Sequence, residues 1–308
     1  MDSPRKVCIG VDIGGTNVRG ALVGAGAVMT RRFRFQSNLE AGAEAFISCL
    51  ESHLGRLRHE AEEAGLQVAG VGVGIPGLIA EDGLIHSSVN LQPLEGWNLA
   101  AELRAKLGVP VVSANDANLI ALGESVAGAG RGMRSLLVVT IGTGLGSGLI
   151  LDRKLWLGDG GFAAEFGHLT VVPEGIPCPC GNRGCLEQYV SASALSRHGG
   201  GRSPEELAHL AGQGDHDACA AFEQMGYWLG VALAGLVNTL NLSGIVVGGG
   251  VSAGFDFFGP MVLTTVQGRA FGAMAESIRI VQAELGDDAG IIGGAILLQE
   301  SGVISGLY

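Results

Sequence analysis

Apolar and polar residues follow two different periods along the chain, and each change of period marks a strand or a helix. Residues 6–13, KVCIGVDI, form an apolar run that ends at paired glycines, and the next stretch, TNVRGALV, alternates apolar with polar residues. We expect two strands joined by a glycine turn. Between residues 41 and 64 a stripe of residues returns at helical spacing, and Gly65 is placed to end that helix. The stripe consists of Ala45, Phe46, Cys49, Leu50, His53, Leu54, Leu57, Ala61 and Ala64.

The rest of the first half continues this order of elements. Residues 68–79, VAGVGVGIPGLI, are typical of a buried strand that Pro76 stops, and residues 109–116, VPVVSAND, of another strand. From Ala117 the stretch ANLIALGESVAG has a helical pattern. We place a domain boundary between residues 117 and 118.

The second half repeats the opening. Residues 135–158, SLLVVTIGTGLGSGLILDRKLWLG, again predict strand, glycine turn and strand, with residues 140–144 in the place of residues 12–16. A helical region, a long apolar helix around 227–241, a strand at 244–250 and a glycine-rich helix at 289–299 follow. We predict an α/β fold with two related α/β domains around a cleft, residues 1–117 and 118–288. The C-terminal helix, within 289–308, is a candidate to rejoin the first domain.

Composition narrows the class of protein. The 308 residues suffice for two domains, and the 53 glycines cluster at strand ends, where the backbone must turn tightly or approach a ligand closely. With 30 acidic against 19 basic residues the formal net charge is −11, which argues against a nucleic-acid surface. The first residues carry no secretory pattern, and no apolar run reaches membrane-spanning length. We therefore expect a cytoplasmic protein with no nucleic-acid or membrane partner.

The six cysteines fall into two groups. We expect Cys8 in a strand, and Cys49 and Cys219 in helices, to be core residues. The other three stand in residues 167–185, GHLTVVPEGIPCPCGNRGC. A disulfide is disfavoured in a reducing compartment, and clustered free thiols are open to oxidation. Three thiolates and one imidazole would complete a closed tetrahedral site, which is typical of structural zinc, so we favour zinc. Its ligands would be His168, Cys178, Cys180 and Cys185.

The two glycine turns are candidates for binding phosphate. A turn without side chains lets backbone N–H groups point at phosphate oxygens, and the hydroxyls of Thr16 and Thr143 add donors. Asp12, just before the first turn, could hold Mg²⁺ through water. No lysine follows the glycines as in a Walker loop, and the expected second strand differs from the helix of a dinucleotide fingerprint. An ordinary tight turn is the alternative for each turn alone. Two turns in matching positions, with a third glycine cluster at 248–250, favour phosphate binding.

Asn115 and Asp116 stand where an apolar strand ends, which is the ligand-facing edge in α/β proteins. A carboxylate there can accept the proton of a hydroxyl that attacks a phosphate. The alternative role is to cap the following helix, since Asp and Asn are both common at that position. The residues alone leave both roles open.

Taken together, these motifs resemble the ROK family of sugar kinases, most closely its bacterial glucokinase branch, over nearly the whole chain. DIGGT and GTGLGSG look like the two phosphate motifs of the family, and GIPG and NDAN like its sugar-side motifs. EFGHLTV with CPCGNRGCLE looks like its signature, and VVGGGV like its adenosine motif. Ser147, where glycine is frequent, and Phe166, where isoleucine is frequent, are small departures.

The resemblance implies an actin-like ATPase (ribonuclease H-like) fold and ATP-dependent phosphorylation of a hexose, with glucose to glucose 6-phosphate as the expected reaction. It implies Asp116 as general base, and ATP, Mg²⁺ and structural Zn²⁺ as cofactors. His168 would bind the metal through one ring nitrogen and the sugar through the other. The implied sugar ligands are Gly77, Asn90, Asn115, Asp116, Glu165, His168 and Glu187. The residues implied at ATP and Mg²⁺ are Asp12, Gly14, Gly15, Thr16, Asn17, Gly142, Thr143, Gly144, Gly146, Gly248 and Gly249.

Several alternatives stay open at this point. Asn90 could instead cap a loop turn. N-acetylmannosamine, N-acetylglucosamine, mannose and fructose kinases belong to the same family, although LEGWNLAAELRAKLGVPV looks more like glucokinases. A sugar-sensing repressor is remote, because the first strand starts near Lys6 with no room for a helix-turn-helix and the charge is acidic. Relatives are commonly dimers or tetramers, so we expect a homodimer or homotetramer.

Overall fold

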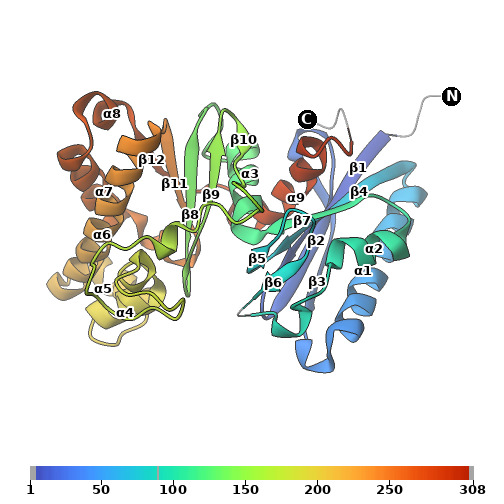
Figure 1. The fold of residues 1–308 in the computed structure, drawn as a ribbon, viewed down its shortest axis with the longest axis horizontal. Coiled ribbons are helices and arrows are strands. Elements are labelled where there is room, and N and C mark those ends of the chain that lie inside the picture. Colours follow the sequence, from blue (N-terminus) through green and yellow to red (C-terminus); the bar gives the residue numbers. More distant parts are fainter. Residues whose placement is uncertain (1–4, 89, 305–308) are drawn as a thin grey trace. The chain divides into compact units, whose positions relative to one another are not determined.

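The structure is a computed structural model that describes residues 5–88 and 90–304 (Figure 1). The chain forms two compact units. Unit 1 contains the residues up to Arg131, Lys154–Ala163 and the residues from Asp287 onward, and unit 2 contains Gly132–Arg153 and Ala164–Gly286. Helix α3 (Asp116–Ala127) lies in unit 1, whereas the boundary expected from the sequence stands at residue 117. Helix α9 (Ala289–Glu300) also lies in unit 1 and ends eight residues before the end of the 308-residue chain.

Unit 1 is built on a five-stranded sheet with the strand order β3–β2–β1–β4–β7 (Figure 1). The first three strands pair antiparallel, and β1–β4 and β4–β7 pair parallel. A separate hairpin of two short strands, β5 and β6, follows β4. The bounds are β1 (Arg5–Ile13), β2 (Asn17–Val23), β3 (Met29–Gln36), β4 (Leu66–Ile75), β5 (Leu78–Ile79), β6 (Ile85–Ser87) and β7 (Val111–Asn115).

The alternating side chains of β1 show which helices cover each face of this sheet. Val7, Ile9 and Val11 belong to the core that includes residues of α1 (Ala43–Glu63) and α2 (Leu99–Leu107). The residue between them, Cys8, belongs to a second core with side chains of α9. Since successive side chains point to opposite faces, α9 covers the face that α1 and α2 leave free. This face is unusually close-packed, because β-strand glycines leave room there for the backbone of α9.

Helix α1 occupies the segment expected from its periodicity, but its buried stripe is narrower. Phe46, Leu50 and Leu54 are buried, whereas Ala45 and Cys49 are exposed. The expectation that Cys49 is a core residue was therefore wrong, because its row of the helix lies at the edge of the stripe that faces the sheet. Among the other expected core thiols, Cys8 is fully buried and Cys219 is partly exposed.

Unit 2 repeats the strand arrangement of unit 1. Its sheet has the order β10–β9–β8–β11–β12, with β8 and β9 antiparallel and β8–β11 and β11–β12 parallel (Figure 1). Helices α6 (His216–Leu240) and α7 (Phe255–Arg269) contribute buried side chains to the core of this sheet. The strands are β8 (Leu136–Ile141), β9 (Leu145–Leu151), β10 (Lys154–Leu155), β11 (Gly244–Gly248) and β12 (Arg279–Gln282). The expected repeat of a strand–glycine-turn–strand opening is thus present in both units.

Several elements carried no clear sequence signal. The short strands β10 and β12 lack an apolar run, and α7 contains Pro260. The remaining helices are α4 (Ala192–His198), α5 (Pro204–Gly212) and α8 (Gly272–Ser277). Within the described residues, no helix combines the length and the apolar character that crossing a membrane requires.

Candidate functional site

The first glycine turn joins β1 to β2 and presents an exposed hydroxyl. The Gly14 N–H donates to the Asn17 carbonyl at 2.8 Å, which closes the turn around Gly15 and Thr16. Ser37 supports the turn, since its hydroxyl donates to the Gly15 carbonyl at 2.6 Å and its N–H donates to the Thr16 carbonyl at 3.0 Å. Thr16 itself is exposed, so its side chain is accessible to a ligand.

Next to this turn lies a row of charges across three strands. Asp12 of β1 pairs in register with Arg19 of β2, and Arg19 pairs with Arg34 of β3. Arg19 forms an ion pair with Asp287, and the Arg34 Nε donates to the Asn17 side-chain oxygen at 3.1 Å. Burial raises the pKa of Asp12, and the Arg19 guanidinium opposes that rise. Asp12 is a partly buried carboxylate next to this glycine turn and could hold Mg²⁺, which keeps most of its waters.

The predicted sugar-side loops of unit 1 are tied together by hydrogen bonds. The Asn115 Nδ2 donates to the Gly77 carbonyl at 2.9 Å, and the Asn115 Oδ1 accepts from the Asn118 N–H at 3.2 Å. The Ser88 hydroxyl donates to the Pro76 carbonyl at 2.5 Å. Asn115 therefore caps α3 and holds the loop at Gly77, so both ends of its side-chain amide already have a structural partner.

Asp116 is the first residue of α3 and is partly buried. Its Oδ1 accepts a hydrogen bond from the Ala117 N–H at 2.9 Å. The helix-capping role that the sequence left open is filled by its neighbour, Asn115.

Asn90 lies against the first glycine turn. A Cβ built on Gly15 would stand 3.1 Å from the Asn90 Cβ. The φ of Gly15 is not in the left-handed region, so the close approach is the feature that distinguishes this position. The structure thus brings one predicted sugar ligand into contact with one predicted phosphate residue.

The second glycine turn joins β8 to β9 in unit 2. The Gly142 N–H donates to the Gly144 carbonyl at 2.9 Å, with the exposed Thr143 between them. Gly146 pairs with Thr140 in the ladder that follows. The turn is one residue tighter than the first one, where the corresponding hydrogen bond joins Gly14 to Asn17.

The third glycine motif stands beside the second. Gly248 ends β11, and Gly249 has a φ of 84°, a conformation that favours glycine. A Cβ on Gly249 would lie 2.6 Å from the backbone nitrogen of Ile141, the residue just before Gly142. Backbone without side chains, from the second glycine turn and from Gly248 and Gly249, therefore lines one edge of the unit 2 sheet.

The two predicted sugar-binding carboxylates of unit 2 are held by the backbone and by one serine. The Glu187 Oε2 accepts from the Leu145 N–H at 2.9 Å. Glu165 is the centre of a tight turn in which the Phe166 N–H donates to the Ala164 carbonyl at 2.7 Å. The buried Ser147 hydroxyl donates to that same carbonyl and accepts from the Phe166 N–H at 3.3 Å. Ser147 is thus more than a neutral replacement for glycine, because its hydroxyl fixes the turn that carries Glu165.

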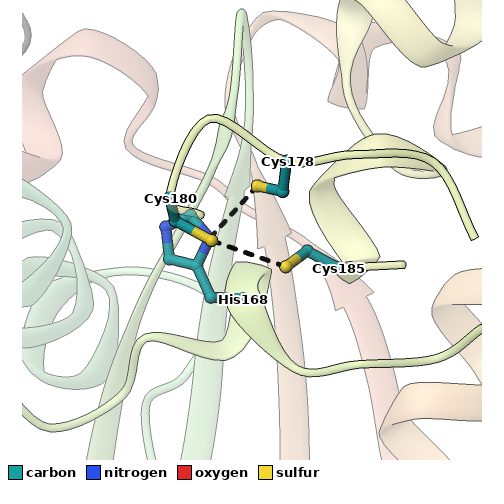
Figure 2. A group of neighbouring side chains, drawn as sticks. All are labelled: His168, Cys178, Cys180 and Cys185. Atoms are coloured by element: carbon teal, nitrogen blue, oxygen red, sulfur yellow. Dashed lines mark hydrogen bonds between the residues drawn. The ribbon is translucent and has the colours of Figure 1, made fainter. Parts of the chain in front are cut away.

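Four candidate metal ligands converge in unit 2. Figure 2 shows His168, Cys178, Cys180 and Cys185 pointing toward one another, and their ligand atoms all lie within 4.8 Å of one another. The Cys178 Sγ is 3.8 Å from the His168 Nδ1, and the Cys180 and Cys185 Sγ atoms are 3.6 Å apart. Ligands about 2.3 Å from one tetrahedral centre stand about 3.8 Å apart, so this spacing suits zinc. All three thiols are free cysteines.

Loop geometry accounts for this convergence. His168 ends a short 3-10 helix (Phe166–His168), and Cys185 precedes another (Leu186–Gln188). Gly181 and Gly184 have φ values of 93° and 69°, which allow the chain to reverse between Cys180 and Cys185. The Tyr189 hydroxyl accepts from the Ile176 N–H at 3.1 Å and holds the far side of the loop.

The protonation of the cluster also bears on metal binding. The Asn182 backbone N–H lowers the pKa of Cys180, whereas burial raises the pKa of Cys185 to about 12. A buried thiol of this kind becomes a thiolate when a metal replaces its proton. The Asn182 side chain donates to the Cys185 Sγ at 3.5 Å and to the Thr170 hydroxyl at 2.9 Å. Sequence reasoning missed Asn182 and Thr170, although Asn182 stands between two of the predicted ligands.

The His168 ring has two different surroundings. Its Nδ1 faces the Cys178 thiol, and its Nε2 is 3.9 Å from the Glu165 Oε2. Burial raises the pKa of Glu165, with the Glu187 carboxylate adding to the rise and His168 opposing it. One nitrogen of the ring is therefore available to a metal while the other faces the predicted sugar-binding carboxylate.

Comparison with known proteins places these features in a family. Residues 8–301 match the ROK family. A glucokinase of Halalkalibacterium halodurans is 32% identical over 95% of this chain and 94% of its own length. A glucokinase of Streptomyces coelicolor is 34% identical over 95% of this chain and 97% of its own length. A ROK family glucokinase from Streptomyces griseus, solved in complex with glucose and AMPPNP, is 31% identical with a TM-score of 0.79 and covers 94% of this chain and 98% of its own. The chain belongs to the ROK family.

The resemblance inferred from the motifs is therefore confirmed, and so is the actin-like ATPase fold, since the solved relatives are sugar kinases of that fold. The site residues divide into a unit 1 group, from Asp12 to Asp116, and a unit 2 group, from Gly142 to Gly249. Within each group the structure brings a glycine turn into contact with a predicted sugar ligand, Asn90 in unit 1 and Glu187 in unit 2.

Proposed function

We propose that this ROK-family sugar kinase transfers the γ-phosphoryl group of ATP to glucose and forms glucose 6-phosphate. The observation that carries the proposal is the likeness, over almost the whole chain, to proteins named glucokinase. The solved relative in complex with glucose and AMPPNP supports both the sugar and the nucleotide. The geometry of the two site groups is compatible with this reaction.

On the nucleotide side, the two turns supply donors for phosphate oxygens. The exposed hydroxyls of Thr16 and Thr143 and the glycine N–H groups around them can bind phosphates, while Gly248 and Gly249 offer a bare backbone to the adenosine. Asp12 would hold Mg²⁺, which supplies charge neutralisation for the phosphates when bound. The sequence departs from a Walker loop, so these backbone donors and hydroxyls replace a lysine.

On the sugar side, Asp116 would take the proton from the attacking hydroxyl. Gly77, Asn90 and Asn115 would bind the sugar together with the unit 2 group of Glu165, His168 and Glu187. Amide and carboxylate groups offer fixed planar partners to neighbouring hydroxyls, so sugars with an inverted or missing hydroxyl would leave buried polar groups unpaired.

The substitution Asp116→Asn tests the base. The amide keeps an oxygen for the Ala117 N–H but cannot accept the proton, so turnover should fall by about 10²–10⁴ while the glucose dissociation constant changes little. Asp215→Asn is the matched control, because Asp215 also stands at a helix start and accepts from the Ala218 N–H at 2.9 Å. Its turnover should equal that of the wild type. A near-normal rate for the Asp116 variant, measured by coupled ADP release, would refute the assignment.

We also propose that the cluster of His168, Cys178, Cys180 and Cys185 binds one structural zinc ion. With four protein ligands the site is closed, so its role is to fix the loop rather than to activate water. This loop carries Glu165 and Glu187, so the metal would order both sugar-binding carboxylates.

Zinc removal should therefore abolish glucose binding before it disrupts nucleotide binding. Cys180→Ser should lose zinc, measured by elemental analysis, and should lose glucose affinity in calorimetry. Cys49→Ser removes an exposed thiol outside the cluster and should keep both. If zinc-stripped protein bound glucose with an unchanged dissociation constant, the proposed coupling would be wrong.

A panel of hexoses tests the choice of sugar. Glucose should give the highest kcat/KM with ATP in a coupled assay, ahead of mannose, fructose, N-acetylmannosamine and N-acetylglucosamine. Replacing ATP with polyphosphate in the same assay tests the phosphoryl donor. The expected homodimer or homotetramer is a separate prediction, to be checked by light scattering.

A further inference from the structure

Gly144, in the second glycine turn, is implied as a phosphate residue, but its surroundings point to the sugar. A Cβ built on Gly144 would overlap the Glu187 Oε2 and lie 3.3 Å from the Glu187 Cδ. The same carboxylate oxygen accepts the hydrogen bond from the Leu145 N–H at 2.9 Å. The space that a side chain at position 144 would need is therefore occupied by a predicted sugar-binding carboxylate.

Two comparisons isolate this contact. Gly142 belongs to the same turn, yet a Cβ there would meet nothing within 4 Å. Neither glycine has a φ in the left-handed region, so alanine fits the backbone conformation at both positions. Alanine at 144 would thus act through its collision with Glu187, whereas alanine at 142 would project into open space.

The hydrogen bond itself is well isolated. Within residues 5–88 and 90–304, the Leu145 N–H is the one hydrogen-bond donor to the Glu187 carboxylate. Leu145 is buried and pairs with Ile141 at the first rung of the β8–β9 ladder. The direction of this N–H is consequently set by the sheet, and the position of Glu187 is set by the N–H.

We propose that Gly144 is a positioning residue of the sugar site: its missing side chain leaves the space in which the Leu145 N–H holds the Glu187 carboxylate. The inference rests on the proposed function, because it takes Glu187 as a sugar ligand. Gly15 in unit 1 shows a similar close approach, since a Cβ there would stand 3.1 Å from the Asn90 Cβ. One glycine of each turn then serves the sugar while the rest of the turn serves the phosphates.

Calorimetry with glucose, without nucleotide, tests this assignment on the zinc-loaded protein. Gly144→Ala should raise the glucose dissociation constant by about tenfold or more, a factor that corresponds to about 1.4 kcal/mol. Gly235→Ala, in helix α6 and outside the predicted site, should leave that constant within about twofold of the wild type, because a Cβ there also meets nothing within 4 Å. In steady-state kinetics Gly144→Ala should raise KM for glucose and leave KM for ATP nearly unchanged. An unchanged glucose constant with a raised KM for ATP would overturn the proposal.

Glu187→Asp supplies a rescue test. Aspartate is one methylene shorter, so its carboxylate withdraws from the position of the new Cβ. The double variant Gly144→Ala/Glu187→Asp should therefore bind glucose no worse than Glu187→Asp alone, and strictly additive losses would overturn the proposal. If Gly144→Ala does not fold, recovery of a cooperative thermal transition in the double variant supports the collision, and no recovery refutes it. A wild-type protein that binds no hexose would instead refute the proposed function.

Discussion

The close packing of α9 on the unit 1 sheet makes a sharp prediction about one glycine. Gly72 lies in β4, and a Cβ there would overlap the carbonyl group of Gly294 in α9 and stand 2.8 Å from its Cα. All three of these atoms belong to the helix backbone, so no rotamer change can relieve the collision. Gly72→Ala must therefore push α9 away from the sheet or bend the strand.

The magnitude follows from two opposing effects. Overpacking in a filled core costs about 1–3 kcal/mol, and a backbone collision belongs at the upper end of that range. Alanine regains about 0.5–1 kcal/mol over glycine within a strand, because it restricts the unfolded chain. The free energy of unfolding of unit 1 should therefore fall by about 2 kcal/mol.

Gly55→Ala provides a control of opposite sign in the same unit. Gly55 lies inside α1, and a Cβ there meets nothing within 4 Å, so the same substitution should stabilise by about 0.8–1 kcal/mol. Urea unfolding followed by circular dichroism measures both variants. A Gly72→Ala protein as stable as the wild type, alongside a stabilised Gly55→Ala protein, would show that α9 does not pack at backbone distance on β4.

Two further predictions concern titration and reactivity. His53 stacks on Phe35 with ring centroids 4.5 Å apart, and burial followed by the Arg56 charge lowers its pKa. The unfolded chain then binds the extra proton, so stability should fall as the pH drops below about 6.5, and His53→Phe should reduce that loss in unfolding experiments at pH 7.5 and 5.5. His59 is exposed on the same helix, so a His59→Phe variant should lose stability between pH 7.5 and 5.5 as the wild type does. Burial raises the pKa of Cys8 to about 12, so a thiol reagent should label the exposed Cys49 in the native protein and Cys8 after unfolding. Peptide mapping that finds Cys8 labelled at the rate of Cys49 would contradict the buried position of β1.

Local pattern was sufficient for the strand–glycine-turn–strand opening of each unit and for the cluster of His168 with three cysteines. The run KVCIGVDI and its glycine turn predict the β1–β2 hairpin, because a buried strand needs apolar residues and a tight turn needs glycine. The cysteine spacing predicts a convergent ligand set for a similar reason. Residues that are close in sequence stay close in space when one short loop carries them. Cys178, Cys180 and Cys185 do so here with His168.

Local pattern failed where a side chain's partner lies far along the chain. The stripe of α1 included Cys49 because periodicity shows one apolar face but not how much of it the sheet covers. The motif NDAN left Asn115 and Asp116 with the same two possible roles. In the structure the Asn115 Oδ1 accepts from the Asn118 N–H, so Asn115 caps the helix, and its Nδ2 donates to the carbonyl of the distant Gly77.

What the sequence by itself determined is thus the strand–glycine-turn–strand opening of each half, the family resemblance and the chemical inventory of the site. Only the tertiary structure decided that Gly144 lies against Glu187, 43 residues later. It also decided that α9 returns to lie on β1 and β4, so close that only glycine fits at Gly10 and Gly72. The physical reason is that local spacing specifies turns and faces through short-range sterics and burial. Which distant residues come into contact depends on how the helices and the sheet pack together, and the order of residues along the chain does not show that packing.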